Sequence, residues 1–144
     1  MSNEANIQSR LSVRKLSGSS VLLDYTSGQA SFVADVNGTK GPTPGAVTIS
    51  TAGTNIDLTA LTTPGFCRIS NQDATNYFEW GIKDASSGIF YPMGEVLPGE
   101  SYVIRLSRNV GEEYYSTTGT DAGNSVHCKA NTASVVALIE CFER

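Results

Sequence analysis

The sequence has little of the side-chain chemistry on which most enzymes depend. It contains a single histidine, His127, which excludes metal sites built from several histidines. Its three cysteines never form a C-x-x-C pair, and no glycine-rich phosphate loop of a familiar pattern occurs. We therefore expect a protein that is not an enzyme, with no cofactor and no bound metal.

Clustered basic residues and long apolar runs are also missing. The chain carries 10 Lys and Arg against 14 Asp and Glu, a formal net charge of -4, with both signs mixed along its length. Phosphate contacts need clustered cations, so nucleic acid is not an expected partner. No apolar run approaches the roughly 20 residues of a membrane span. The first ten residues, MSNEANIQSR, lack the apolar core of a secretory leader.

The few polar residues with possible chemistry favour a structural interpretation. His127 lies on the polar phase of an alternating segment, without a nucleophile motif around it, and we expect it to be exposed on a sheet. Glu112, Glu113 and Asp121 share one polar loop and offer oxygen atoms that calcium prefers. Their spacing matches no EF-hand, so solvated loop charge is the preferred interpretation.

Cysteine usage bears on the redox environment. Cys67, Cys128 and Cys141 each lie on the apolar phase of a segment. An odd number at wide spacing is not typical of a disulfide framework, and free buried cysteines behave as small hydrophobic residues. We therefore predict three reduced, buried thiols and synthesis in a reducing cytoplasm, with one disulfide as the open alternative.

What the sequence does have is period-two alternation bounded by turns. Residues 67–70, 77–82 and 102–106 alternate between apolar and polar side chains, as half-buried antiparallel strands do. Asn71–Asn76 can close a turn through its own side chains, and Pro98-Gly99 suits the centre of a type II turn. About ten short strands of this kind predict an all-β fold, an antiparallel β-sandwich of the jelly-roll or immunoglobulin-like type.

The expected organisation is an extended N-terminal arm, residues 1–8, followed by one β-sandwich domain, residues 9–144. Residues 37–45 are rich in proline and glycine and are expected to form an exposed loop, because proline cannot donate to a sheet ladder. Residues 107–124 form a long polar connection, and such connections are often functional. The last strand, residues 133–142, is apolar in both phases, which predicts cover on both faces at a sheet centre or at a contact between copies.

Tyrosines are the best candidates for contacts with a partner or ligand, because each presents an apolar ring with a polar tip. Trp80 shares its phase with apolar neighbours and is assigned to the core. The candidate contact residues are Tyr77, Tyr91, Tyr114 and Tyr115.

Several segments resemble small β-sandwich structural proteins of tailed bacteriophages. The segments are Gly65–Asn71, Asp73–Tyr77, Phe90–Pro92, Leu97–Glu100 and Lys129–Ala133, and together with the strands around them they cover roughly half of the chain. The resemblance implies a virion component, assembled in the host cytoplasm, without catalysis. It does not fix a position on the head, neck or tail.

The expected function is that of a non-enzymatic virion structural protein, in particular a capsid decoration or cement protein that stabilises the head lattice. Its expected partners are the major capsid protein or other virion proteins, and further copies of itself, with a trimer favoured. Such proteins act through buried interface area rather than through a polar catalytic cluster. The alternative is a carbohydrate- or receptor-binding module of a phage tail or fibre, in which the tyrosines would stack on sugar rings.

Overall fold

The computed structural model describes residues 5–34, 36, 38–84, 86–107 and 125–144. These residues form strands joined by turns and loops, with no helix among them. All strand pairs are antiparallel, which confirms the expected all-β class. The chain divides into two compact units, Met1–Val36 and Asn37–Arg144.

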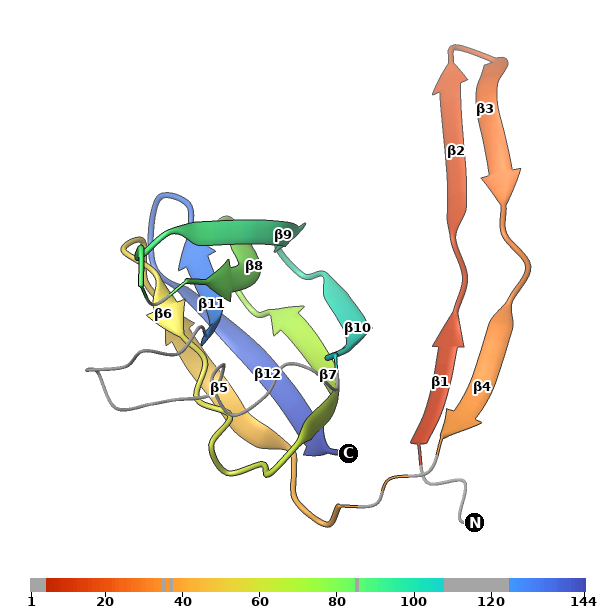
Figure 1. Cartoon of the computed structure of the whole chain (residues 1–144). Coiled ribbons are helices and arrows are strands. Elements are labelled where there is room, and N and C mark those ends of the chain that lie inside the picture. Colours follow the sequence, from red (N-terminus) through yellow and green to blue (C-terminus); the bar gives the residue numbers. More distant parts are fainter. Residues whose placement is uncertain (1–4, 35, 37, 85, 108–124) are drawn as a thin grey trace. The chain divides into compact units, whose positions relative to one another are not determined.

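The N-terminal unit is a two-stranded ribbon, residues 5–34. Strand β1 (Ala5–Ser9) pairs with β4 (Ala30–Ala34), and β2 (Ser12–Ser17) pairs with β3 (Ser20–Thr26). The two pairs follow one another as a single long ribbon (Figure 1). They are joined by hydrogen bonds in which the Ser27 amide donates to the Leu11 carbonyl at 2.8 Å and the Leu11 amide donates to Ser27 Oγ at 2.9 Å.

The division into units differs from the one expected. The sequence predicted an arm of residues 1–8 and a sandwich of residues 9–144, whereas the boundary lies after Val36 and the strands of residues 9–34 belong to the ribbon. Period-two alternation shows that a segment is a strand, but it does not show which sheet the strand joins. The described part of the predicted arm is itself a paired strand, β1.

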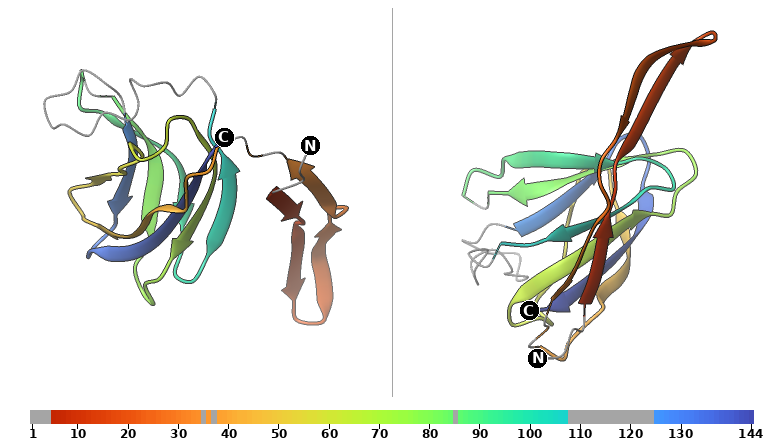
Figure 2. Two further views of the ribbon diagram at one scale, coloured as in Figure 1. Left: turned by 90° about the horizontal axis from the view of Figure 1, so that it is seen from below. Right: turned by 90° about the vertical axis from the view of Figure 1, so that its right-hand side faces the viewer.

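The C-terminal unit is a sandwich of two four-stranded sheets, seen from two further sides in Figure 2. One sheet has the order β10-β7-β12-β5 and the other β6-β11-β8-β9. The bounds are β5 Thr43–Ile49, β6 Thr54–Asn55, β7 Pro64–Asn71, β8 Phe78–Lys83, β9 Phe90–Val96, β10 Ser101–Arg105, β11 Ser125–Ala130 and β12 Val135–Glu143.

The core lies between the inner faces of the two sheets. Phe78 from β8, Val96 from β9 and Ile49 from β5 are fully buried. Trp80 is half-buried and packs against this cluster. The alternation on which the sequence analysis relied therefore points the expected side chains inward.

Strand β12 occupies the centre of its sheet, between β7 and β5. Its inner residues, such as Val135 and Ala137, are buried, as predicted. On the other face Val136 remains 48% exposed and Phe142 40% exposed. Only one of the two expected layers therefore covers β12 within the described residues.

The expected loop of residues 37–45 is shorter than predicted. Thr43, Pro44 and Gly45 open strand β5, and Pro44 stands opposite Glu140 of β12. Strand β5 is an edge strand, and an edge is the place in a sheet that tolerates a residue without an N–H group.

The two turns singled out in the sequence form as predicted. Asp73 Oδ1 accepts hydrogen bonds from the amides of Thr75 and Asn76, at 2.8 and 2.7 Å, and these bonds lower the pKa of the Asp73 carboxyl. At the second turn the Glu100 amide donates to the Leu97 carbonyl at 3.0 Å, and Gly99 takes the positive φ of 77° that a type II turn requires.

The prediction of three free thiols is wrong. Cys67 of β7 and Cys141 of β12 stand opposite each other in the register and form a disulfide, with 4.1 Å between their Cα atoms. Cys128 is free and buried, and burial raises the pKa of its thiol to about 12. The residues are buried as expected, but their sequence spacing gave no sign that β7 and β12 would be neighbours.

Candidate interaction surfaces

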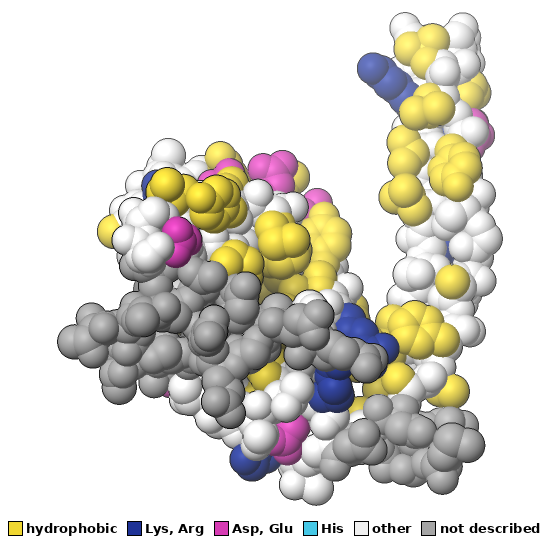
Figure 3. Space-filling view, viewed as in Figure 1, with side chains coloured by type: hydrophobic (Ala, Val, Ile, Leu, Met, Phe, Trp, Pro, Cys, Tyr) yellow, Lys and Arg dark blue, Asp and Glu magenta, His cyan; other side chains and the backbone are white. Residues whose placement is uncertain are grey.

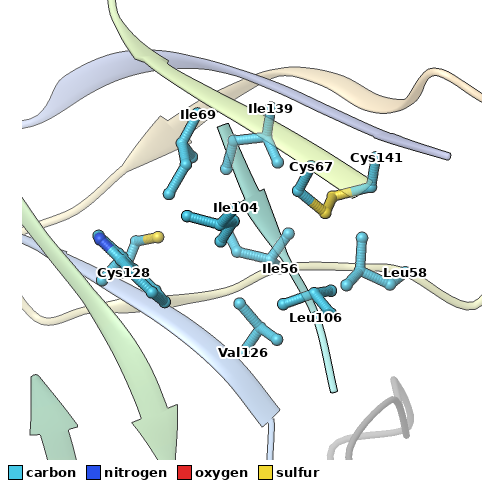
Figure 4. A pocket seen from close by; sticks show the side chains of 11 residues that line it. Ile56, Leu58, Cys67, Ile69, Ile104, Leu106, Val126, Cys128, Ile139 and Cys141 are labelled. Atoms are coloured by element: carbon cyan, nitrogen blue, oxygen red, sulfur yellow. A yellow bond between two sulfur atoms is a disulfide. The ribbon is translucent and has the colours of Figure 1, made fainter. Parts of the chain in front are cut away.

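The space between the two sheets is too small to hold a ligand. The cavity has a volume of about 20 Å³ and an apolar lining that includes Ile56, Trp80, Ile104 and Val126 (Figure 4). A drug-sized ligand site needs roughly 300–1,000 Å³, whereas this volume is close to that of one water molecule. It is a packing gap in the core.

His127 is buried, contrary to the prediction that it is exposed. It does lie on the outer face of its sheet, but a cover of other side chains leaves it only 4% exposed. The Phe90 ring packs against the imidazole at 5.0 Å between centroids. Gly53, with a positive φ of 100°, lies so close to Nε2 that a side chain there would collide with the ring.

The polar partners of His127 hold it in place without activating a nucleophile. Asn55 Oδ1 lies 2.7 Å from His127 Nδ1 and accepts a hydrogen bond from Ser125 Oγ at 2.9 Å. An amide oxygen has no proton, so Nδ1 is the donor and the serine hydroxyl is directed to the amide rather than to the imidazole. Burial, together with the positive charges of Lys83 and Lys129, lowers the pKa of His127 to about 4.

The described residues do not form a metal site. They contain no group of three or more His, Cys, Asp or Glu able to hold an ion. Glu112, Glu113 and Asp121, the calcium alternative, lie outside the described residues. Those described also form no helix able to cross a membrane.

The structure does not bring the candidate tyrosines together. Tyr77 is half-buried at the start of β8, whereas Tyr91 is exposed and stands opposite Ile82 near the other end of that strand. Five strand positions separate them, a distance of roughly 17 Å. Tyr114 and Tyr115 lie outside the described residues. No stacking platform is visible among the described tyrosines.

The ribbon carries many exposed apolar side chains. Nine of its large apolar residues are between 38% and 60% exposed, and apolar side chains occur along its whole length in Figure 3. An isolated two-stranded hairpin is only marginally stable in water. The exposed apolar residues are Leu11, Val13, Leu16, Val21, Leu22, Leu23, Tyr25, Phe32 and Val33.

Where Ser12–Lys15 pairs with Leu23–Thr26, the large apolar residues of the ribbon lie on one face. Opposite residues of antiparallel strands share a face, and the face alternates along the strand. The pairs Val13 with Tyr25 and Lys15 with Leu23 therefore lie on one side. We call Val13, Leu23 and Tyr25 the apolar ribbon face.

The opposite side of this paired segment is polar. It carries the pair Ser12 and Thr26, joined by a hydroxyl hydrogen bond of 3.2 Å, and the ion pair of Arg14 and Asp24 at 3.7 Å. A ribbon with one apolar and one polar face is suited to lie against another surface rather than to stand free in water.

A second apolar surface follows strand β9. Four residues on β9 and the turns at its ends are 41–68% exposed, and we call them the β9 rim: Ile89, Tyr91, Met93 and Leu97. Beside them Glu79 of β8 stands directly opposite Glu95 of β9. The β9 edge thus carries exposed apolar residues and two acidic residues.

Neither the ribbon nor the β9 rim was predicted from the sequence as an exposed apolar surface, although Tyr91 was named as a contact residue. The signal for the ribbon was present, because residues 11–36 alternate and contain large apolar residues. It was assigned to the sandwich, where those residues would have been buried. Comparison of the chain with protein families, curated proteins and solved structures found no match.

Proposed function

We propose that this chain is a non-enzymatic structural protein of a tailed-bacteriophage virion, a decoration protein that holds onto the capsid lattice through its N-terminal ribbon. The observation that carries the proposal is the apolar ribbon face, whose three side chains are 38–54% exposed. The phage assignment rests on the resemblance of the central segments, and the ribbon supplies the means of attachment.

Two further features support a role in assembly. The ribbon, residues 5–34, is about the size of one side of a standard protein interface, which uses roughly 20–30 residues. The disulfide between Cys67 and Cys141 suits a protein that works outside a reducing cell, because disulfides persist on virion surfaces and in other oxidising environments. The buried and neutral His127 and the small cavity offer no competing catalytic site.

Binding to empty capsids tests the proposal. The intact chain is expected to co-sediment at micromolar concentration with capsids assembled from the major capsid protein with which it is encoded. The triple variant Val13→Ser, Leu23→Ser and Tyr25→Ser removes the apolar ribbon face and should remain in the supernatant. The matched control, Ser12→Ala with Thr26→Ala on the opposite face, should bind as the intact chain does.

Two results would contradict the decoration role. The intact chain could stay in the supernatant, or the triple variant could bind as tightly as the control. In the first case a glycan array with the intact chain examines the carbohydrate-binding alternative. A signal lost in Tyr91→Ala, or in Tyr114→Ala with Tyr115→Ala, while the circular dichroism spectrum is unchanged, would support that alternative.

A further inference from the structure

Among the strands with an open edge, β2 and β9 carry charges of opposite sign. Strand β2 has β3 on one side only, and β9 has β8 on one side only. An edge strand presents a row of N–H and C=O groups that another strand can bind. Within the described residues no strand occupies either edge.

The charges of the two strands are opposite in sign. Strand β2 contains Arg14 and Lys15 and no acidic residue, and β9 contains Glu95 and no basic residue. Both strands have an open edge.

At the β9 edge, Glu95 has no basic residue opposite it in the described sheet. Glu79 and Glu95 face each other across β8 and β9, and like charges directly opposite are destabilising. Neither makes an ion pair with another described residue. The basic Lys129 stands on the β11 side of Glu79, so Glu95 is the member of the pair that faces the open edge.

We propose that the free edge of β2 in one copy of this chain adds antiparallel to the free edge of β9 in a second copy, with Arg14 beside Glu95. The added strand extends the sheet and places a positive charge next to Glu95. Alternation along the strands then puts Val13 and Lys15 on the face that carries Tyr91. The inference deepens the proposed decoration function by naming how copies join to one another.

The charges on β2 disfavour pairing between the β2 edges of two ribbons. Edge-to-edge pairing of two ribbons through β2 would bring Arg14 and Lys15 close to their own counterparts, and like charges across an interface cost binding energy. Pairing of β2 with β9 is instead head to tail, so it forms a ring when the rotation closes. The trimer favoured from the sequence is one such ring.

Sedimentation equilibrium of the full chain tests this contact by charge reversal. The intact chain should self-associate, and Arg14→Glu or Glu95→Arg alone should weaken association about tenfold, because each places like charges together. The double variant with both changes exchanges the two charges and should restore association. Arg105→Glu, an equal charge reversal on β10 of the other sheet, is the control and should associate like the intact chain.

The proposal is overturned when the intact chain stays monomeric up to about 100 μM, a concentration at which only contacts too weak to matter would be missed. It is also overturned when the exchanged double variant associates no better than the single variants. A cross-link between Arg14→Cys and Glu95→Cys within one chain, in a monomer, would show that the ribbon docks on its own sandwich and would equally exclude it.

Self-association and capsid binding fail independently. A monomeric chain that co-sediments with capsids would leave the decoration function standing and remove the β2–β9 contact. A chain that assembles through this contact but does not bind capsids would support the β2–β9 contact and contradict the decoration function.

Discussion

His127 shows how a polar residue on an outer sheet face can become part of the interior. Its place on the polar phase of β11 was read correctly from the sequence, and the structure places it on the outer face. Its cover could not be predicted, because Gly53, Asn55 and Phe90 come from distant parts of the chain. Alternation reports the direction of a side chain but not what lies above it.

The buried imidazole predicts a pH dependence of stability. The pKa of His127 is lowered from 6.5 to about 4, so between these values the unfolded chain binds a proton that the folded chain does not. The contribution of His127 to stability should therefore be constant above pH 6.5 and fall as the pH drops below it. One proton contributes a slope of up to about 1.4 kcal/mol per pH unit.

Urea denaturation from pH 8 to pH 5 measures this slope, and His127→Gln is the informative variant. The decline between pH 6.5 and 5 should disappear in it. Asp73, Asp84 and Glu143, whose carboxyl pKa values are lowered by hydrogen bonds, lose their stabilising effect only at lower pH, as they become protonated. A decline of the same size in the variant would show that another group is responsible.

At the scale of elements, the positions of the sandwich strands could be predicted from the sequence better than the pairing between the strands. The alternation of residues 67–70, 77–82 and 102–106 and the two predicted turns all appear in β7, β8 and β10 and the loops beside them. The short strand β6 was not predicted. The edge position of β5 was not predicted either, because Pro44 was assigned to a loop. Strand pairing is set by contacts distant in sequence, which a local pattern does not contain.

The disulfide is an example of such a distant contact, and its removal has a definite expected effect. It joins residues 74 positions apart, and closing a loop of that length stabilises a fold by about 4 kcal/mol in the chain-entropy description. Cys67→Ala with Cys141→Ala should lower the unfolding free energy by that order. Guanidinium denaturation with and without reductant provides the measurement.

Cys128→Ala is the control, because it keeps the disulfide. Its stability should still fall on addition of reductant, whereas that of the double variant should not. Thiol titration in denaturant without reductant should detect one group in the intact chain, Cys128. Three reactive thiols would show that the disulfide does not form.

At the scale of the whole molecule, the chain combines a sandwich that has its own core with a ribbon that has none. The sandwich buries apolar residues from both sheets, while every large apolar residue of the ribbon's outer half is at least 38% exposed. The described residues contain no group of three or more His, Cys, Asp or Glu able to hold a metal, and the cavity between the two sheets is too small for a drug-sized ligand. The class of fold could be predicted from period-two alternation. The boundary between ribbon and sandwich could not, because alternation does not show which strands pack against a second sheet.

The central claim is that a partner completes the ribbon, and hydrogen–deuterium exchange of the full chain tests it most directly. In dilute solution the ribbon amides, residues 5–34, should exchange much faster than those of β7 and β12, because an uncovered two-stranded ribbon opens easily. On addition of empty capsids the ribbon amides should become protected while the sandwich core changes little. Ribbon amides that are as protected as the core in the dilute monomer, or that gain no protection from capsids, would contradict the account.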